Sequence, residues 1–302
     1  MTTRTRLTIL FMLSLMLNGW RHNAIPGVRL HTSRLLAAPA QVVKPPAPFA
    51  QHSPIEWRRL EEGLWFTQVD ALAKGRKVNR VALVKVDPNR YRLRVFHDLK
   101  VKTIEEWQAA TGATVMFNSS YYGDDYQPVG LILVDGTPKG PKRNKAMKGM
   151  LVAEPKDGST PRATIIPLTA HGYDLNHSPW TQGVQSFPML LDPDGRIGVK
   201  RSNWRANRTV IATDRKGHLL IFTTEGGFFT LYGFAQFLRH SDFDIAYALN
   251  LDGGYEAEMC VKTKDFFYVT YGQWETNDTG DISIPGIRIK IPAVIGVFPR
   301  SQ

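Results

Sequence analysis

The stretch that decides the fold runs from Val210 to Gly254 and reads VIATDRKGHLLIFTTEGGFFTLYGFAQFLRHSDFDIAYALNLDGG. Its β-branched and apolar runs Val210–Thr213 and Leu219–Thr223 flank a Gly turn, which predicts a hairpin. Apolar residues at helical spacing predict a helix over Thr230–Arg239, and Ala246–Leu251 is an apolar strand. Because strand, turn, strand, helix and strand do not alternate regularly, we expect an α+β fold. This is a single domain with a mixed β-sheet and a few helices, and it is not doubly wound.

Similar signals occur on both sides of this stretch. Thr103 with Glu106 three residues later is typical of a capping box, so a short helix is expected to end at Gly112. Further strands are predicted where apolar, β-branched or aromatic residues are bounded by turn residues, at Leu64–Val69, Arg80–Val86, Tyr91–Phe96, Thr114–Phe117, Leu131–Val134 and Met189–Leu191.

Composition limits the class of protein. The 302 residues are 43% hydrophobic and 22% charged, as in globular proteins, which excludes a disordered chain. The net charge is +11, but residues 1–60 hold eight Lys or Arg and one acid, so the rest carries only +4. A domain that binds nucleic acid is therefore not expected. The single cysteine, Cys260, excludes an internal disulfide and a cysteine zinc site.

The N-terminus indicates export. Arg4 and Arg6 precede the apolar run Leu7–Leu17, which is too short to span a bilayer of roughly 30 Å as a helix. We interpret residues 1–40 as a signal peptide or N-terminal anchor region, so that any membrane contact is made through an uncleaved N-terminal segment. A fortuitous apolar N-terminus of a cytosolic protein is the alternative. Residues 41–54 contain four prolines and form a linker, and residues 55–302 form the domain, which we expect in the periplasm or outside the cell.

Two predicted strands end in small and polar residues. One runs into Asn118-Ser119-Ser120 and the other into Asp252-Gly253-Gly254. Carboxylates at Glu256 and Glu258 follow at a spacing of two, on one face of an extended chain, and suit acid–base or metal-ligand chemistry. For Glu258 a solvated strand edge is the alternative. Arg208 precedes a strand, where its guanidinium is placed to bind an anion. We expect Asn118, Arg208 and Asp252 to lie together in one cleft.

Two further features bear on ligands. The segment Lys139–Lys148 holds five basic residues, and a solvated loop is favoured over a phosphate-binding one. No His-rich metal motif occurs, so we expect no cofactor; a divalent metal is the alternative, which the ligand spacing does not indicate.

An ordered series of motifs is more specific than any of these signals. The motifs are Phe117–Tyr122 (FNSSYY), Gln127–Leu131 (QPVGL), Gln185–Leu190 (QSFPML), Asn207–Ala212 (NRTVIA), Phe229–Leu238 (FTLYGFAQFL), Ala248–Gly254 (ALNLDGG) and Ile291–Phe298 (IPAVIGVF). In this order they resemble the phosphodiester glycosidase family, over about residues 104–299.

The resemblance implies a hydrolase that cleaves a sugar-1-phosphodiester on a glycan and leaves a phosphomonoester. It implies an exported enzyme that acts on an envelope or extracellular polysaccharide. Arg208 would hold the phosphate, Asp252 would act as general acid, base or nucleophile, and Glu256 would be the second carboxylate that glycosidases need. The implied substrate-binding residues are Asn118, Ser119, Tyr121, Tyr122, Gln185, Ser186, Gly253 and Gly254.

Two motifs depart from the family pattern. The usual Asn-Gly-Gly-Phe-Phe is Asn118-Ser119-Ser120-Tyr121-Tyr122 here, and small residues after Leu-Asp-Gly-Gly are replaced by Tyr255-Glu256-Ala257-Glu258. A carboxylate at Glu256 repels a phosphodiester unless it is protonated, metal-bound or opposed by Arg208. The alternative function is a non-catalytic carbohydrate-binding or envelope-assembly protein, in which Tyr121, Tyr122 and Tyr255 stack on sugars.

Overall fold

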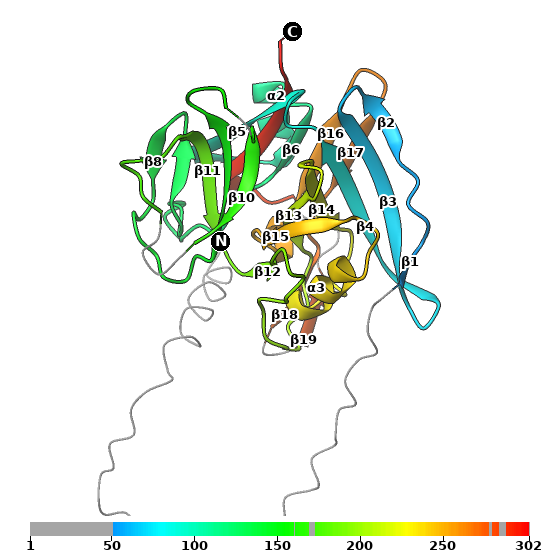
Figure 1. Ribbon diagram of the computed structural model, residues 1–302. Helices are drawn as coiled ribbons and strands as arrows, with labels where there is room; N and C mark the ends of the chain where they lie inside the picture. Colours follow the sequence, from blue (N-terminus) through cyan, green and yellow to red (C-terminus); the bar gives the residue numbers. More distant parts are fainter. Residues whose placement is uncertain (1–50, 160, 169–172, 278–279, 284–287, 302) are drawn as a thin grey trace, which may run out of the picture. The chain divides into compact units, whose positions relative to one another are not determined.

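The chain folds into three antiparallel sheets and a short ribbon (Figure 1). This computed structural model describes residues 51–301 except 160, 169–172, 278–279 and 284–287. In the order of their pairing, the large sheet contains β1 (Gln51–His52), β3 (Leu64–Ala73), β4 (Arg76–Val86), β14 (Leu219–Thr224), β13 (Thr209–Asp214), β15 (Ile245–Asn250) and β12 (Met189–Leu191), with β2 (Arg58–Glu61) also on β3.

The two smaller sheets have five strands each. The β6 sheet orders β17 (Phe267–Thr270), β16 (Met259–Lys262), β6 (Val115–Asn118), β20 (Ile291–Pro299) and β5 (Tyr91–Lys102). The β9 sheet orders β10 (Ala163–Pro167), β9 (Gly149–Pro155), β11 (Trp180–Ser186), β7 (Ile132–Val134) and β8 (Thr137–Lys139). The ribbon pairs β18 (Trp274–Asn277) with β19 (Gly280–Ser283).

The sequence predictions of fold and elements are confirmed. The domain is α+β and not doubly wound, and β13 and β14 form the expected hairpin. The helix α2 (Ile104–Thr111) begins with a complete capping box at Thr103 and ends at Gly112, whose φ of 69° is left-handed. The helix α3 (Leu231–Arg239) begins at the N-cap Thr230, whose hydroxyl accepts from the Gly233 N–H.

The core lies where the three sheets face one another. On β4, Ala82 and Val84 point into this central cluster, while Val81 and Leu83 point to the opposite face, which α3 covers. This alternation follows from the two-residue period of a strand. Burial on both faces explains why the segments Val81–Val84 of β4 and Val210–Ala212 of β13 are continuously apolar. The helix α2 packs on β6 and β20 and covers the outer face of their sheet.

The large sheet begins upstream of the expected domain start at Ile55. Gln51 and His52 pair with β3, and the Ser53 amide donates to the Asp70 carbonyl at 3.0 Å. The expected signal peptide or anchor and most of the expected linker lie in residues 1–50, outside the described residues. Within the described part of the chain, no helix is long and apolar enough to cross a membrane.

The topology brings separate segments to one place. Val210 of β13 pairs with Asn250 of β15, and these strands run antiparallel. The residue before β13, Arg208, therefore lies beside the turn that follows β15. The end of β6 reaches the same turn, because the Asp252 amide donates to the Ser119 carbonyl at 3.2 Å.

Candidate active site

The turn after β15 is held by the end of β6. Asn118 Nδ2 donates to the Asp252 carbonyl at 3.0 Å, and Asp252 Oδ1 accepts from the Gly253 N–H at 2.9 Å. A Cβ on Gly253 would lie 2.8 Å from the Asn207 carbonyl and 3.6 Å from an Nη of Arg208. Only glycine therefore lets this turn approach the main chain of Asn207, the residue before Arg208, so closely. The structure thus brings Asn118, Arg208 and Asp252 together.

Arg208 is a buried cation, with 4% of its surface exposed. Its Nε donates to the Phe229 carbonyl at 3.1 Å and Nη2 to the Trp204 carbonyl at 2.9 Å. Burial lowers the pKa of Arg208 to about 10. This value is still well above neutral pH, so the guanidinium stays charged at pH 7. Among the described residues it has no ion pair, and Nη1 has no hydrogen-bond partner. The protein therefore orients a buried positive charge without a direct ion pair, and the nearby charge of Glu275 compensates part of it.

Two carboxylates lie on the turn beside Arg208. Asp252 and Glu256 are both half-buried. Burial, with the charge of Glu256, raises the pKa of Asp252 well above its ordinary value. Burial, with the charge of Glu275, raises the pKa of Glu256 to about 7. Since like charges close together resist ionising together, Asp252 and Glu256 retain a proton at neutral pH.

Glu275, which the sequence analysis missed, is the third carboxylate. It lies on β18, and a Cβ on Gly254 would be 3.0 Å from Glu275 Oε2. Burial raises the pKa of Glu275 to about 6, and the charge of Arg208 opposes this rise. No local motif marks Glu275. Its position depends on Asn207, whose Oδ1 accepts from the amides of Gln273 at 3.0 Å and Trp274 at 2.8 Å.

Glu258 lies behind the site. The interpretation of this residue as a solvated strand edge is wrong, because its exposed fraction is 1%. The chain is not extended here either: Gly254–Glu256 forms a 3-10 turn (η1), so the condition for Glu256 and Glu258 to share one face is not met. Burial, with the charges of Glu105 and Glu256, raises the pKa of Glu258 to about 9, so it is neutral at pH 7.

The side chains of other predicted ligand-binding residues form hydrogen bonds within the protein. The Asn118 amide group donates to two carbonyls and accepts from the Glu258 N–H at 3.2 Å. Gln185 Oε1 accepts from the Leu131 amide at 3.2 Å, and Ser186 Oγ accepts from Ser120 at 2.9 Å. In the structure these side chains hold the turns together.

The tyrosines of the altered motif lie beside the carboxylates. The Tyr121 hydroxyl donates to the Phe187 carbonyl at 3.0 Å and accepts from Asn250 Nδ2 at 2.7 Å. The Tyr122 hydroxyl donates to Glu256 Oε1 at 3.4 Å. Burial, with the charge of Glu256, raises the pKa of Tyr122, so it stays a donor to that carboxylate. The hydroxyl that distinguishes Tyr122 from the family's phenylalanine thus contacts a catalytic candidate.

Ser119 also lies in the site. Its hydroxyl is buried and has no hydrogen-bond partner among the described residues. Such a buried hydroxyl is an available donor or acceptor for a ligand. In the described residues, no group of three or more His, Cys, Asp and Glu side chains is arranged to hold a metal ion.

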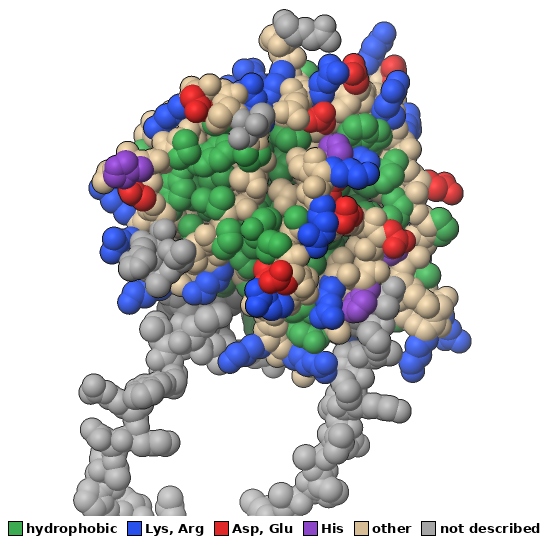
Figure 2. Space-filling view, in the orientation of Figure 1, with side chains coloured by type: hydrophobic (Ala, Val, Ile, Leu, Met, Phe, Trp, Pro, Cys, Tyr) green, Lys and Arg blue, Asp and Glu red, His purple; other side chains and the backbone are tan. Residues whose placement is uncertain are grey.

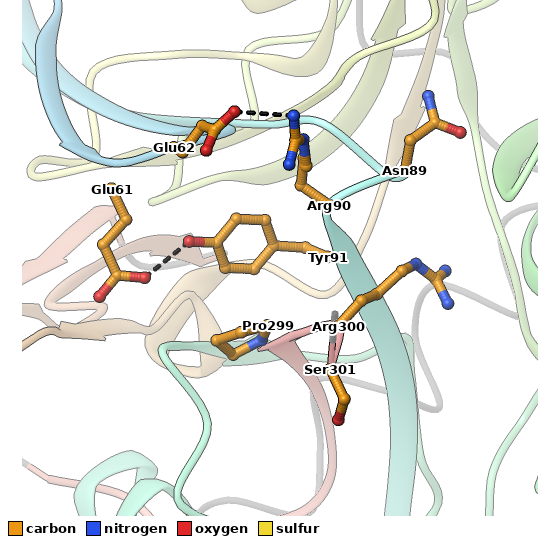
Figure 3. Close-up of a pocket in the computed structure, with 8 residues that line it drawn as sticks. All are labelled: Glu61, Glu62, Asn89, Arg90, Tyr91, Pro299, Arg300 and Ser301. Atoms are coloured by element: carbon orange, nitrogen blue, oxygen red, sulfur yellow. Dashed lines mark hydrogen bonds and ion pairs between the residues drawn. The ribbon is translucent and has the colours of Figure 1, made fainter.

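A separate pocket lies at the start of β5 and the end of β20 (Figure 3). This pocket, the Arg300 pocket, has a volume of about 340 Å³ and is lined by Glu61, Glu62, Asn89, Arg90, Tyr91, Pro299, Arg300 and Ser301. Its charges are paired: Arg90 contacts Glu62 at 2.7 Å, and Tyr91 donates to Glu61 at 2.7 Å. It contains none of the predicted site residues.

The comparisons with known structures agree on the fold. The catalytic domain of zebrafish N-acetylglucosamine-1-phosphodiester α-N-acetylglucosaminidase, auto-inhibited by its pro-peptide, has a TM-score of 0.60 and 15% identity, over 83% of this chain and 88% of that one. A hypothetical protein from Synechocystis has a TM-score of 0.54 and 16% identity, over 82% and 64%. A Burkholderia pseudomallei protein, provisionally described as exported, has a TM-score of 0.50 and 12% identity, over 73% and 74%.

The sequence comparisons identify the family. No curated protein matches the chain. A family model described as phosphodiester glycosidase matches residues 111–298, more than half of the chain. That range includes the strand ends that carry Asn118, Arg208 and Asp252, together with Glu256 and Glu275. The chain therefore belongs to the phosphodiester glycosidase family.

Proposed function

We propose that this protein is an exported hydrolase that cleaves the glycosidic bond of a sugar-1-phosphodiester on a glycan. The observation that carries this proposal is the buried, unpaired Arg208 beside the proton-retaining carboxylates Asp252 and Glu256. A cation and an acid in one site suit a substrate with an anionic group next to a bond that is to be hydrolysed.

Arg208 binds the phosphodiester in this proposal. A buried charge without a direct ion pair is costly, and an anionic ligand lowers that cost. The two main-chain carbonyls hold the guanidinium plane and leave Nη1 available to the ligand. Charge-assisted hydrogen bonds to phosphate oxygens are among the strong ones, so Arg208 contributes to substrate affinity.

Asp252 and Glu256 perform the chemistry. Because they retain a proton together, the pair offers one acid and one carboxylate, the combination that glycosidases use. The carboxylate deprotonates the attacking water, or it attacks C1 itself and forms a glycosyl ester that water then hydrolyses at C1 to release the sugar. In either route the C1–O bond breaks, and its electron pair stays on the bridging oxygen, which leaves with the phosphate. Burial, with the charge of Glu275, places the pKa of Glu256 at about 7, so that Glu256 supplies the carboxylate near neutral pH while Asp252, whose pKa is raised further, holds the proton.

Export and an envelope or extracellular glycan are part of the proposal. Arg4, Arg6 and the run Leu7–Leu17 support export. The provisional description of the Burkholderia neighbour as exported is consistent with it. Fractionation of cells that produce the full chain tests this part: we expect the protein outside the cytosol, and intact protein in the cytosol contradicts export.

The experiment for the activity is a panel of sugar-1-phosphodiesters, including N-acetylglucosamine esters, incubated with residues 51–302 and with the full chain. We expect free sugar and phosphomonoester from at least one compound, and none from the same compounds with Asp252→Asn. Binding of a sugar ester without turnover by the wild-type protein contradicts the hydrolase and supports the carbohydrate-binding alternative.

A further inference from the structure

Basic residues are concentrated in two segments that border the candidate site. The segments 139–148 and 196–208 together hold ten of the 38 Lys and Arg residues and no acidic residue. One of the ten is Arg208 itself, at the centre of the site. Arg196 forms an ion pair and is set aside, and we call the other exposed basic residues of the two segments the basic rim. They are Lys142, Arg143, Lys145 and Lys148 in the first segment and Lys200, Arg201 and Arg205 in the second.

The rim cations lack acidic partners. Arg196 contacts Asp192 at 2.7 Å and Asp194 at 2.8 Å, which neutralises it. No rim residue forms an ion pair within the part of the chain that the structure describes. Instead, Arg201 lies over the Tyr232 ring at 4.9 Å and Arg205 over the Phe228 ring at 5.6 Å. Both arginines are thus positioned while their charge stays uncompensated.

Both rim segments are attached to site residues. The Lys148 amide donates to the Ser186 carbonyl at 2.9 Å, and Ser186 bonds Ser120 of the altered motif. On the other side, the Trp204 carbonyl accepts from Arg208, and the Arg205 amide donates at 2.9 Å to the hydroxyl of Thr276, the neighbour of Glu275. Figure 2 shows Lys and Arg side chains along the lower edge of its face, where Figure 1 places β12, β18 and α3.

The charge pattern selects a class of substrate. At the centre, the carboxylates outnumber Arg208, so a ligand with several negative groups is not favoured there. Around the centre, seven cations attract negative charge over a wider area. We infer that, given the proposed function, the substrate is a polyanionic glycan, in which one phosphodiester reaches Arg208 while negative groups on neighbouring units contact the basic rim.

The test is binding of the full chain to dextran sulfate and to neutral dextran of equal length. The rim variant Lys142→Gln/Arg143→Gln/Lys145→Gln removes three exposed charges that make no side-chain hydrogen bond within the described residues. The matched control Lys100→Gln/Lys216→Gln/Lys262→Gln removes three exposed charges outside the two segments. We expect the rim variant to bind dextran sulfate about tenfold more weakly at ~50 mM salt and about twofold or less at ~500 mM, because salt screens exposed charges. The control variant and neutral dextran should show no such change.

Three results overturn the inference: equal weakening in both variants, no weakening in the rim variant, or tighter rim-dependent binding to phosphatidylglycerol vesicles than to dextran sulfate. The last result points to a membrane surface instead. Turnover of a small sugar phosphodiester is measured in parallel. Its absence in every variant contradicts the proposed function and leaves the binding comparison interpretable, whereas turnover with rim-independent binding contradicts only the present inference.

Discussion

The Arg300 pocket and the candidate active site contain the same residue types in opposite states. Arg300 donates to both carboxylate oxygens of Glu154, at 2.8 and 2.6 Å, and Arg90 pairs with Glu62. Arg208 donates only to main-chain carbonyls, although it is far more buried. Its neighbouring carboxylates retain protons. One region therefore uses charge pairs to join separate segments of the fold, and the other keeps its charges available to a ligand.

This difference indicates how the fold separates stability from chemistry. An Arg–Glu pair joined by two hydrogen bonds satisfies both side chains and leaves few donors or acceptors for a ligand. An unpaired buried cation and proton-retaining carboxylates cost folding free energy that ligand binding can recover. Substitutions that are harmless in the Arg300 pocket should consequently be severe in the site.

Asp252→Asn has the largest expected effect. The amide keeps the shape and an oxygen acceptor for the Gly253 N–H, but it cannot exchange a proton or act as a carboxylate. We expect kcat to fall by about 10²–10⁴-fold with an unchanged melting temperature. The matched control is Glu62→Gln in the Arg300 pocket, an exposed carboxylate that should keep wild-type kcat. Wild-type kcat in Asp252→Asn would make Asp252 a structural turn residue.

Arg208→Lys comes second. Lysine keeps the positive charge but loses the planar group that bonds the Phe229 and Trp204 carbonyls. KM for a sugar phosphodiester should rise by roughly 10- to 100-fold, with a smaller fall in kcat. Arg90→Lys, at a surface ion pair, should change neither constant. A fall in kcat at unchanged KM would contradict phosphate binding by Arg208.

The third prediction concerns the pH dependence of activity. Activity should rise as pH rises through about 7, where Glu256 loses its proton and becomes the carboxylate beside the protonated Asp252. The negative charge of Glu275 helps to raise the pKa of Glu256, so Glu275→Gln should move this rising limb to lower pH. Glu258→Gln is the control, since Glu258 is neutral at pH 7. A limb that stays in place in Glu275→Gln would show that Glu275 does not act on Glu256.

The smallest effect concerns stability. The pKa of Glu258 rises from its ordinary 4.5 to about 9 on folding. Between these values the folded state holds a proton that the unfolded state has released, so stability falls as pH rises. Replacing Glu258 by Gln should make the free energy of unfolding, measured in urea from pH 5 to 9, less dependent on pH. An unchanged slope would mean that Glu258 is ionised in the folded protein.

Local signals predict the parts of the molecule that depend on neighbouring residues. The capping box at Thr103, the N-cap Thr230 and the hairpin of β13 and β14 are all readable because their partners lie within a few residues. The position of Arg208 beside Asp252 is also predictable, because each precedes or follows a recognisable strand and belongs to a family motif.

The features that the sequence does not predict depend on contacts between residues far apart in the chain. Glu275 reaches the site through main-chain bonds to Asn207, 66 and 67 residues away, and no spacing rule records such a contact. The burial of Glu258 is equally hidden, because the chain turns at η1 just before it and a spacing of two residues does not record that turn. Strands β16 to β20 lie beyond the segments for which strands were predicted, yet β20 joins β5 to β6 in the middle of their sheet.

The central claim is that the site cleaves the sugar–oxygen bond of a phosphodiester held by Arg208. The most direct measurement is hydrolysis of an active sugar-1-phosphodiester in ¹⁸O-enriched water, with mass spectrometry of both products. We expect ¹⁸O at C1 of the released sugar and none in the phosphomonoester, because water attacks carbon and the bridging oxygen leaves with phosphate. Label in the phosphomonoester would show attack at phosphorus and would contradict the account.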